Sequence, residues 1–228
     1  KTVGINELRD TTRDFWIYFG GQNSHSHSDM LNLGVEAYGL NLAPENGYPE
    51  GTSATPSRGQ WTNTTIAHNT VTVDEKPSFK PAKAGDPLHF DGKDTRVKVM
   101  DIAVPEAYEE TKEYRRTVVM VDYDSDISYG VDFFKILGGD DHLYSFHAAS
   151  EVIGEYSENI KPYHQPTGSY AGVDVPFGDD PWTDTTNNYA RMKYPLGYTW
   201  LFDVRRADNP DISENEPFFA DFDIIDFN

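Results

Sequence analysis

The sequence predicts an all-β protein, built as a large antiparallel β-sandwich. Period-two alternation outweighs helical periodicity along the chain, and the alternating runs are rich in β-branched and aromatic residues. Gly, Pro, Asn and Asp bound these runs, as hairpin connections require. With 37% hydrophobic residues among 228, the chain can bury a full core. Since we find no internal repeat and no linker, we expect a single sandwich domain over residues 1–228.

The strands follow from short apolar and aromatic runs in chain order. Between residues 30 and 42, the run MLNLGVEAYGLNL could form a short helix, but its two Gly residues favour paired strands. Farther along the chain, at about residues 160–185, we expect a looser segment rich in Pro and Gly. The other expected strands are FWIYFGG (15–21), NTVTVD (69–74), TRVKVMDIAV (95–104), YRRTVVMVD (114–122), YGVDFFKIL (129–137), HLYSFHAA (142–149), YTWLFDVRRA (198–207) and FFADFDIIDF (218–227).

Composition excludes several classes of partner and site. The formal net charge of −19 argues against a nucleic acid or an anionic membrane, because both bind clustered cations. No apolar run is long enough to span a bilayer. Zero Cys excludes disulfides, thiolate zinc sites and cysteine nucleophiles. The sequence starts at Lys1 without a Met or a signal-peptide pattern, so we expect a processed protein or a piece of a longer one.

Three histidines and one glutamate form the candidate site. His25 and His27 are two residues apart, so on a strand both would face one side. His68 precedes a strong strand, and Glu45 lies in the turn APENGYP, whose curvature can aim a carboxylate inward. Two His and one carboxylate with an open fourth position form a recurrent zinc set, and the lack of thiolate also allows other divalent metals. A polar loop with two surface histidines is the ordinary alternative.

Two other metal-binding motifs, a calcium loop and a cupin motif, do not match the sequence in their spacing. The acidic hairpin at residues 122–126 starts like a calcium loop, but Ile127 stands where the turn needs Gly and Phe133 where a bidentate Glu belongs. A cupin motif would place its Glu four or five residues after the second His. Glu36 is nine residues after His27, so a cupin is disfavoured.

A longer pattern resembles a known family. HSHSDMLNLGVEAYGLNLAPENGYP (25–49) is followed by Trp61, then by TIAHNTVTVDEK, YRRTVVMVD and YGVDFFKILGGDDHLYSFH. Together these motifs resemble the C-terminal β-sheet domain of heparinase II/III-type polysaccharide lyases, which include the oligoalginate lyases. The resemblance runs from about Phe15 to His147 and weakens toward the end. It implies a β super-sandwich that follows an N-terminal helical (α/α) toroid, in a secreted or periplasmic bacterial enzyme.

The resemblance also implies roles for individual residues. His27, Glu45 and His68 match the positions that hold a mainly structural zinc ion in such lyases. The family usually has Asp in the turn, so Glu45 is a departure that alters the geometry of coordination. His25 would face the substrate, neutralising a uronate carboxylate or assisting proton transfer. Tyr48, directly after the turn, is a second catalytic candidate lining the cleft.

The reaction implied is β-elimination of a uronate-bearing glycan: a glycosaminoglycan such as heparin or heparan sulfate, or alginate. Neutralising the uronate carboxylate acidifies the neighbouring carbon, and a Tyr or His then removes its proton. The resembling enzymes carry their main Tyr, an Asn and another His on the toroid, and nothing in this sequence reads as that toroid. We therefore expect a partner, either an N-terminal helical domain or a second chain, and no activity without it.

Substrate contacts are less specific in the sequence. Trp61 could stack on a sugar ring, or it could be an ordinary sandwich-edge Trp. Arg58, Arg115 and Arg116 could provide local cations for a polyanionic substrate, although adjacent strand arginines are ordinarily solvated. The alternative function is a non-catalytic carbohydrate-binding or structural β domain that keeps the metal as a staple.

Overall fold

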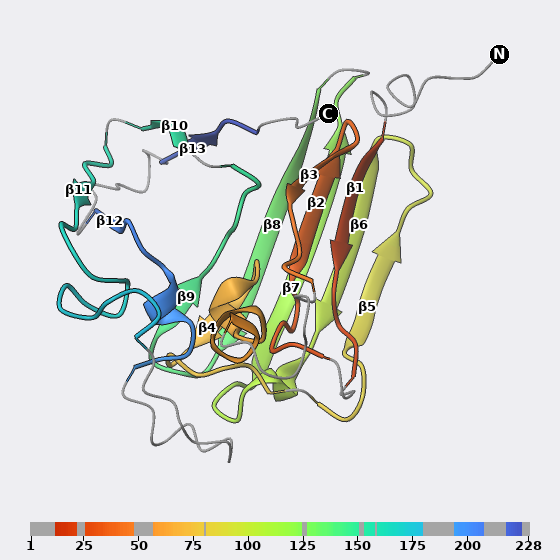
Figure 1. Ribbon diagram of the computed structural model, residues 1–228. Coiled ribbons are helices and arrows are strands. Elements are labelled where there is room, and N and C mark those ends of the chain that lie inside the picture. The colour runs from red at the N-terminus through yellow and green to blue at the C-terminus, as the bar shows by residue number, and fades with distance from the viewer. Residues whose placement is uncertain are drawn as a thin grey trace. The chain divides into compact units, whose positions relative to one another are not determined.

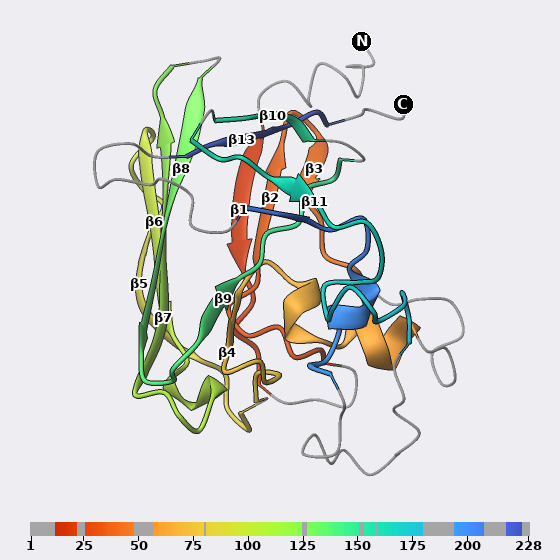
Figure 2. The same cartoon turned by 90° about the vertical axis from the view of Figure 1, so that its left-hand side faces the viewer.

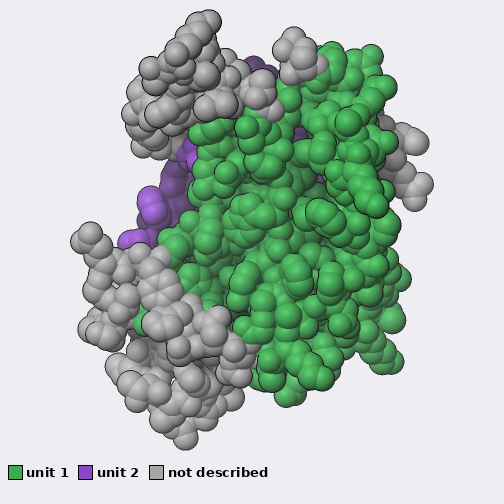
Figure 3. Space-filling model, turned by 90° about the vertical axis from the view of Figure 1, so that its right-hand side faces the viewer, with its two compact units in different colours: residues 1–147 green, residues 148–228 purple. Residues whose placement is uncertain are grey.

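The computed structural model describes residues 12–21, 26–47, 57–79, 81–124, 127–150, 153–157, 159–179, 194–207 and 218–224. Contacts divide the chain into two compact units, residues 1–147 and 148–228 (Figure 3). Every strand pairing among the described residues is antiparallel, which confirms the predicted fold class. The expectation of a single domain over residues 1–228 stays a prediction.

Two sheets form the body of the first unit and lie face to face (Figures 1 and 2). The four-stranded sheet is a meander whose spatial order follows the chain. The three-stranded sheet has the order β1 (Arg13–Ile17), β2 (Leu33–Ala37), β3 (Leu40–Ala43), and the meander consists of β5 (Asp86–Asp91), β6 (Val97–Ala103), β7 (Glu113–Asp122) and β8 (Ser128–Leu137).

Strand alternation builds the core between these sheets. Along β7, Tyr114, Arg116, Val118 and Met120 are buried while the residues between them are partly exposed. The inward positions therefore form one stripe of the core, as period-two geometry requires. Phe15 of β1 packs onto Gly130 of β8, where a Cβ would lie only 2.4 Å from the ring. A side chain at position 130 would displace the Phe15 ring, so glycine allows the two sheets to approach closely here.

The ambiguous segment at residues 30–42 contains a hairpin, as the sequence favours. β2 and β3 pair with Ala37 opposite Leu40, which leaves a two-residue loop. Both loop residues, Tyr38 and Gly39, have positive φ angles, 56° and 74°. Such a loop matches the right-handed twist of the strands that it joins.

Shorter elements complete the first unit. β4 (Val71–Val73) pairs with β9 (His142–Tyr144), which ends earlier than the predicted strand over residues 142–149. The sequence did not predict β5, whose six residues are all exposed and carry no alternation of burial. The helical elements of this part are the π-helix η1 (Arg58–Thr62) and the 3-10 helices η2 (Thr65–Ala67) and η3 (Pro105–Ala107).

The second unit contains short strand pairs. β10 (Ile153–Tyr156) pairs with β13 (Ala220–Phe222), and β11 (Tyr163–His164) pairs with β12 (Arg205–Arg206). The predicted strand over residues 198–207 is wrong for its first part, because the 3-10 helix η5 (Tyr198–Trp200) follows Gly197, whose φ is 84°. Turns and bends dominate residues 165–179, within the predicted looser segment, and residues 180–185 lie outside the described residues.

Candidate metal centre

Four side chains in the first unit form a compact group of metal-ligand types. His27, Asp29, Glu45 and His68 each offer one nitrogen or oxygen atom, and these atoms all lie within 4.8 Å of one another. His27, Asp29 and His68 are buried, and Glu45 is partly buried. The structure thus brings together the three predicted ligands and adds Asp29.

These ligands come from three segments that lie far apart in the sequence. His27 and Asp29 lie in an irregular stretch before β2, so the expectation that a strand holds the His-x-His pair is wrong for His27. Glu45 lies two residues after the end of β3, and His68 lies between η2 and β4. Leu31 is fully buried with a left-handed φ of 58°, which turns the chain from the first segment into β2.

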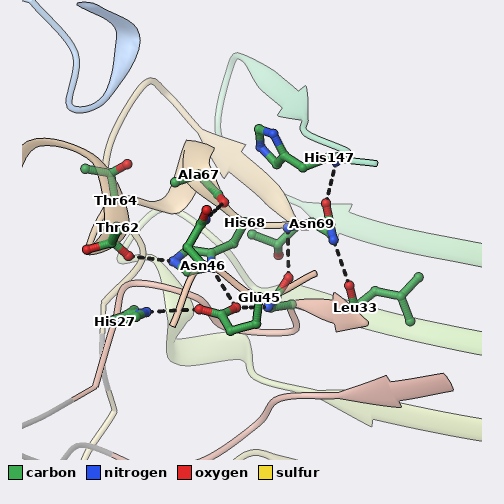
Figure 4. Close-up of polar contacts among 12 residues, drawn as sticks. His27, Leu33, Glu45, Asn46, Thr62, Thr64, Ala67, His68, Asn69 and His147 are labelled. Atoms are coloured by element: carbon green, nitrogen blue, oxygen red, sulfur yellow. Dashed lines mark hydrogen bonds and ion pairs between the residues drawn. The ribbon is translucent and has the colours of Figure 1, made fainter. Parts of the chain in front are cut away.

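Glu45 lies between the two imidazoles (Figure 4). Its Oε1 is 3.1 Å from His27 Nδ1, and its Oε2 is 3.1 Å from His68 Nδ1. The other ring nitrogen of His68, Nε2, lies 3.0 Å from the carbonyl oxygen of Thr62. A carbonyl only accepts, so Nε2 donates there and, in the neutral ring, Nδ1 carries the lone pair.

This tautomer has a consequence for the centre. A lone pair on His68 Nδ1 and an ionised Glu45 oxygen repel each other at 3.1 Å unless a cation shares them. The cation is either a proton on the imidazole or a metal ion. Metal-binding histidines ordinarily donate their second ring N–H to a carbonyl or carboxylate, as His68 does to Thr62.

The two carboxyl groups have opposite electrostatic environments. Burial raises the pKa of Asp29 to about 6; His68 opposes this rise and Glu45 adds to it. Burial also raises the pKa of Glu45, but hydrogen bonds with His27 and His68 outweigh it and lower the pKa to about 2. The environment therefore favours the ionised form of Glu45. It disfavours the ionised form of Asp29, and additional positive charge nearby would reverse this.

Two buried asparagines, Asn32 and Asn69, hold the segments of the cluster in place. Asn32 donates to Glu45 Oε2 and accepts from the backbone N–H of Asn69 at 2.8 Å. The Asn69 side chain donates to the Leu33 carbonyl and accepts from the His147 N–H. These contacts hold the backbone beside His68 and join all three segments of the cluster.

Arg116 supports the same segments from β7. It is fully buried, forms a bidentate pair with Asp132 at 2.9 and 2.8 Å, and donates to the carbonyls of Leu31 and Asn69. Arg115, on the opposite face of β7, is bound to Asp101. The idea that both arginines serve a substrate cleft is therefore wrong for Arg116, because alternation turns it into the core.

The remaining candidate residues are Trp61, Arg58, His25 and Tyr48. Trp61 and Arg58 lie on η1, which also carries Thr62, and Trp61 meets His147 edge-on with ring centroids 5.8 Å apart. Their contacts with a sugar stay predictions. His25 and Tyr48 lie outside the described residues. Sequence reasoning gave no role to Asp29, although its place two residues after His27 in HSHSD was the available signal.

Comparison with known proteins identifies the family. The family described as "Heparinase II/III-like, C-terminal" matches residues 17–224. The chain belongs to this heparinase II/III-like family. The match covers the metal-ligand segments and extends through both units. No curated protein matches the chain.

Solved structures show the same fold. A heparinase III crystal structure is 16% identical with a TM-score of 0.50, over 68% of this chain and 24% of that one. The heparinase III-BT4657 gene product is 18% identical with a TM-score of 0.54, over 70% and 24%. A mutant of the heparan sulfate lyase HepC from Pedobacter heparinus is 15% identical with a TM-score of 0.51, over 70% and 26%. The aligned part spans about a quarter of each of these structures.

In the part of the chain that the structure describes, we find no helix with the length and apolar character of a membrane span.

Proposed function

We propose that the chain is the β domain of a secreted or periplasmic bacterial polysaccharide lyase that cleaves uronate-bearing glycans by β-elimination. The family match over residues 17–224 is the observation that carries this proposal. The substrate is an acidic polysaccharide or oligosaccharide: a glycosaminoglycan of the heparin or heparan sulfate kind, or alginate. Because the similar structures are heparinase III proteins and a heparan sulfate lyase, heparan sulfate is the first substrate to test.

The proposal includes one divalent metal ion, zinc, held by His27, Glu45 and His68. The donor set fits: it consists of imidazole and carboxylate, without thiolate. The two nitrogen–oxygen distances of 3.1 Å also fit, because tetrahedral zinc with bonds of about 2.1 Å separates its ligands by roughly 3.4 Å. When bound, the ion would supply positive charge among buried carboxylates and link three chain segments.

The chemistry on the substrate falls to other residues. We assign His25 the task of meeting the uronate carboxylate, whose neutralisation stabilises the enolate-like anion as the neighbouring proton leaves. Tyr48 is the candidate within this chain for moving a proton, either from the carbon or to the departing glycosidic oxygen. The main base would come from an N-terminal helical domain or a second chain, which closes the cleft and positions its groups.

The net charge of the chain is a second reason to propose another component. A net charge of −19 repels a polyanion at long range, so the cleft needs local cations. Arg116 is buried in the core and Arg115 is paired with Asp101. Arg58 on η1 and the second component are the sources that we propose, with Trp61 as a stacking surface for a sugar.

A non-catalytic carbohydrate-binding or structural β domain is the second candidate function. One observation favours it: the cluster holds three loop segments to the sandwich. A metal ion with a purely structural role would account for such a cluster. In this reading the ion stabilises the fold and no elimination occurs with any partner.

An assay of the intact parent protein separates the two functions. It would be given heparin, heparan sulfate and alginate, and the ultraviolet absorbance of the unsaturated product would be followed. The lyase proposal expects product from at least one of them, and its absence from all would favour the binding domain. Elemental analysis of protein purified without added metal tests the centre separately: we expect about one zinc per chain, and a content near zero would refute the metal.

A further inference from the structure

Asp29 is the member of the cluster that neither the zinc set predicted from the sequence nor the family resemblance assigns. It lies two residues after His27, and only 7% of its surface is exposed. Its carboxylate and the ligand atoms of His27, Glu45 and His68 all lie within 4.8 Å of one another. Because buried carboxylates are costly without a partner, its position at the centre calls for an explanation.

The contacts of Asp29 leave one oxygen to be explained. Its backbone carbonyl accepts from the Asn32 N–H at 2.9 Å, which fixes the turn. Its side-chain Oδ1 is completely buried and has no hydrogen-bond partner within the described part of the chain. Buried polar atoms of native proteins nearly always have a partner, so an atom left over beside three metal-ligand side chains points to a cation.

We infer that Asp29 is the fourth ligand of the proposed metal ion and closes its coordination shell. This inference rests on the proposed metal centre and deepens it. Two imidazoles and two carboxylates complete the four positions that structural zinc prefers, whereas a catalytic zinc keeps one position for water or substrate. Two carboxylates also balance the charge of a divalent ion, which leaves the buried centre neutral.

Closure changes what the centre does for the protein. With no exchangeable position, the ion binds neither solvent nor the sugar, and it works by holding the segment of His27 and Asp29 to Glu45 and His68.

Cobalt(II) substitution tests the inference without an activity assay. Co²⁺ takes the place of zinc and absorbs visible light with an intensity and shape that depend on its ligands. The full chain would be compared with Asp29→Ala and the isosteric Asp29→Asn. Glu36→Gln serves as the matched control, because Glu36 is exposed on β2 in the same stretch of sequence. Azide, which binds only at an exchangeable position, would be titrated into each Co²⁺ protein.

We expect azide to leave the spectra of the wild type and Glu36→Gln unchanged and to alter that of Asp29→Ala. Zinc affinity should fall at least about tenfold in Asp29→Ala, as it does when metal-site groups are removed, and less in Asp29→Asn. An azide response in the wild type, or wild-type zinc affinity and spectra in both Asp29 variants, would overturn the inference while leaving the metal centre standing. Failure of the wild type to bind Zn²⁺ or Co²⁺ at all would refute both.

Discussion

At the scale of single residues, His25 and His27 are two positions apart but receive different tasks. His27 points its Nδ1 at Glu45 inside the cluster, whereas His25 is assigned to the substrate. In the intact enzyme, His25→Ala should lower turnover roughly a hundredfold or more, as losses of acid–base groups do, with metal content and melting temperature nearly unchanged.

The matched variants in this comparison are His27→Ala and His68→Ala. Each should lose metal first and lower the melting temperature, because an ion that binds only the folded state stabilises it by about 3 kcal/mol at a concentration a hundredfold above its Kd. Equal metal loss in His25→Ala and His27→Ala would contradict this division of roles.

Glu45 gives a pH dependence with a definite sign. In the metal-free chain its folded pKa is about 2, below its ordinary 4.5, because the hydrogen bonds with His27 and His68 outweigh burial. A depressed carboxyl pKa stabilises the fold fully above the unfolded value, and this contribution is lost as pH falls from 4.5 toward 2. The difference in unfolding free energy between wild type and Glu45→Gln, measured in urea, should shrink over that range. A constant difference would show that the ionised Glu45 contributes nothing.

At the scale of elements, β7 carries two adjacent arginines that lie in different environments. Arg116 is buried and paired with Asp132, whereas the side chain of Arg115 is 37% exposed beside Asp101. Arg116→Met should lower the free energy of unfolding by about 3–5 kcal/mol, because it removes the cation that pairs with Asp132 and the donor to the carbonyls of Leu31 and Asn69. Arg115→Met, the control on the same strand, should cost less, because the Arg115 side chain is 37% exposed and Asp101 keeps the Thr117 hydroxyl as a donor. Equal losses in urea unfolding would show that the inward arginine has no special role.

Sequence reasoning succeeded for elements with their own periodicity. Burial alternates along β7 from Glu113 to Val121 and along β8 from Asp132 to Leu137. The two Gly residues of the 30–42 segment correctly favoured a hairpin. β5 was missed because all its residues are exposed, so no alternation marks it. The stretch at 198–207 misled because its aromatic and β-branched residues suit a strand, while the left-handed Gly197 starts a 3-10 turn instead.

The grouping of His27, Glu45 and His68 could be predicted from the sequence, but the surroundings of the site could not. His27, Glu45 and His68 were found from residue type and family resemblance, and the fold brings them together. Asp29 had a signal in its spacing from His27, but the Thr62 carbonyl reaches His68 through the approach of a π-helix in space, which no local pattern encodes. The inward turn of Arg116 was within reach, since alternation already places adjacent strand residues on opposite faces.

At the scale of the whole molecule, we propose that this β domain needs a second component for elimination. The solved structures that share its fold are about four times longer than the part that aligns. The most direct test measures the ultraviolet absorbance of unsaturated product from the 228-residue chain given heparan sulfate, alone and then with the upstream domain of its parent protein added. We predict no product from the chain alone and product once that domain is restored, because its base is then within reaction distance. Product from the isolated chain would contradict the account and show that His25 and Tyr48 suffice.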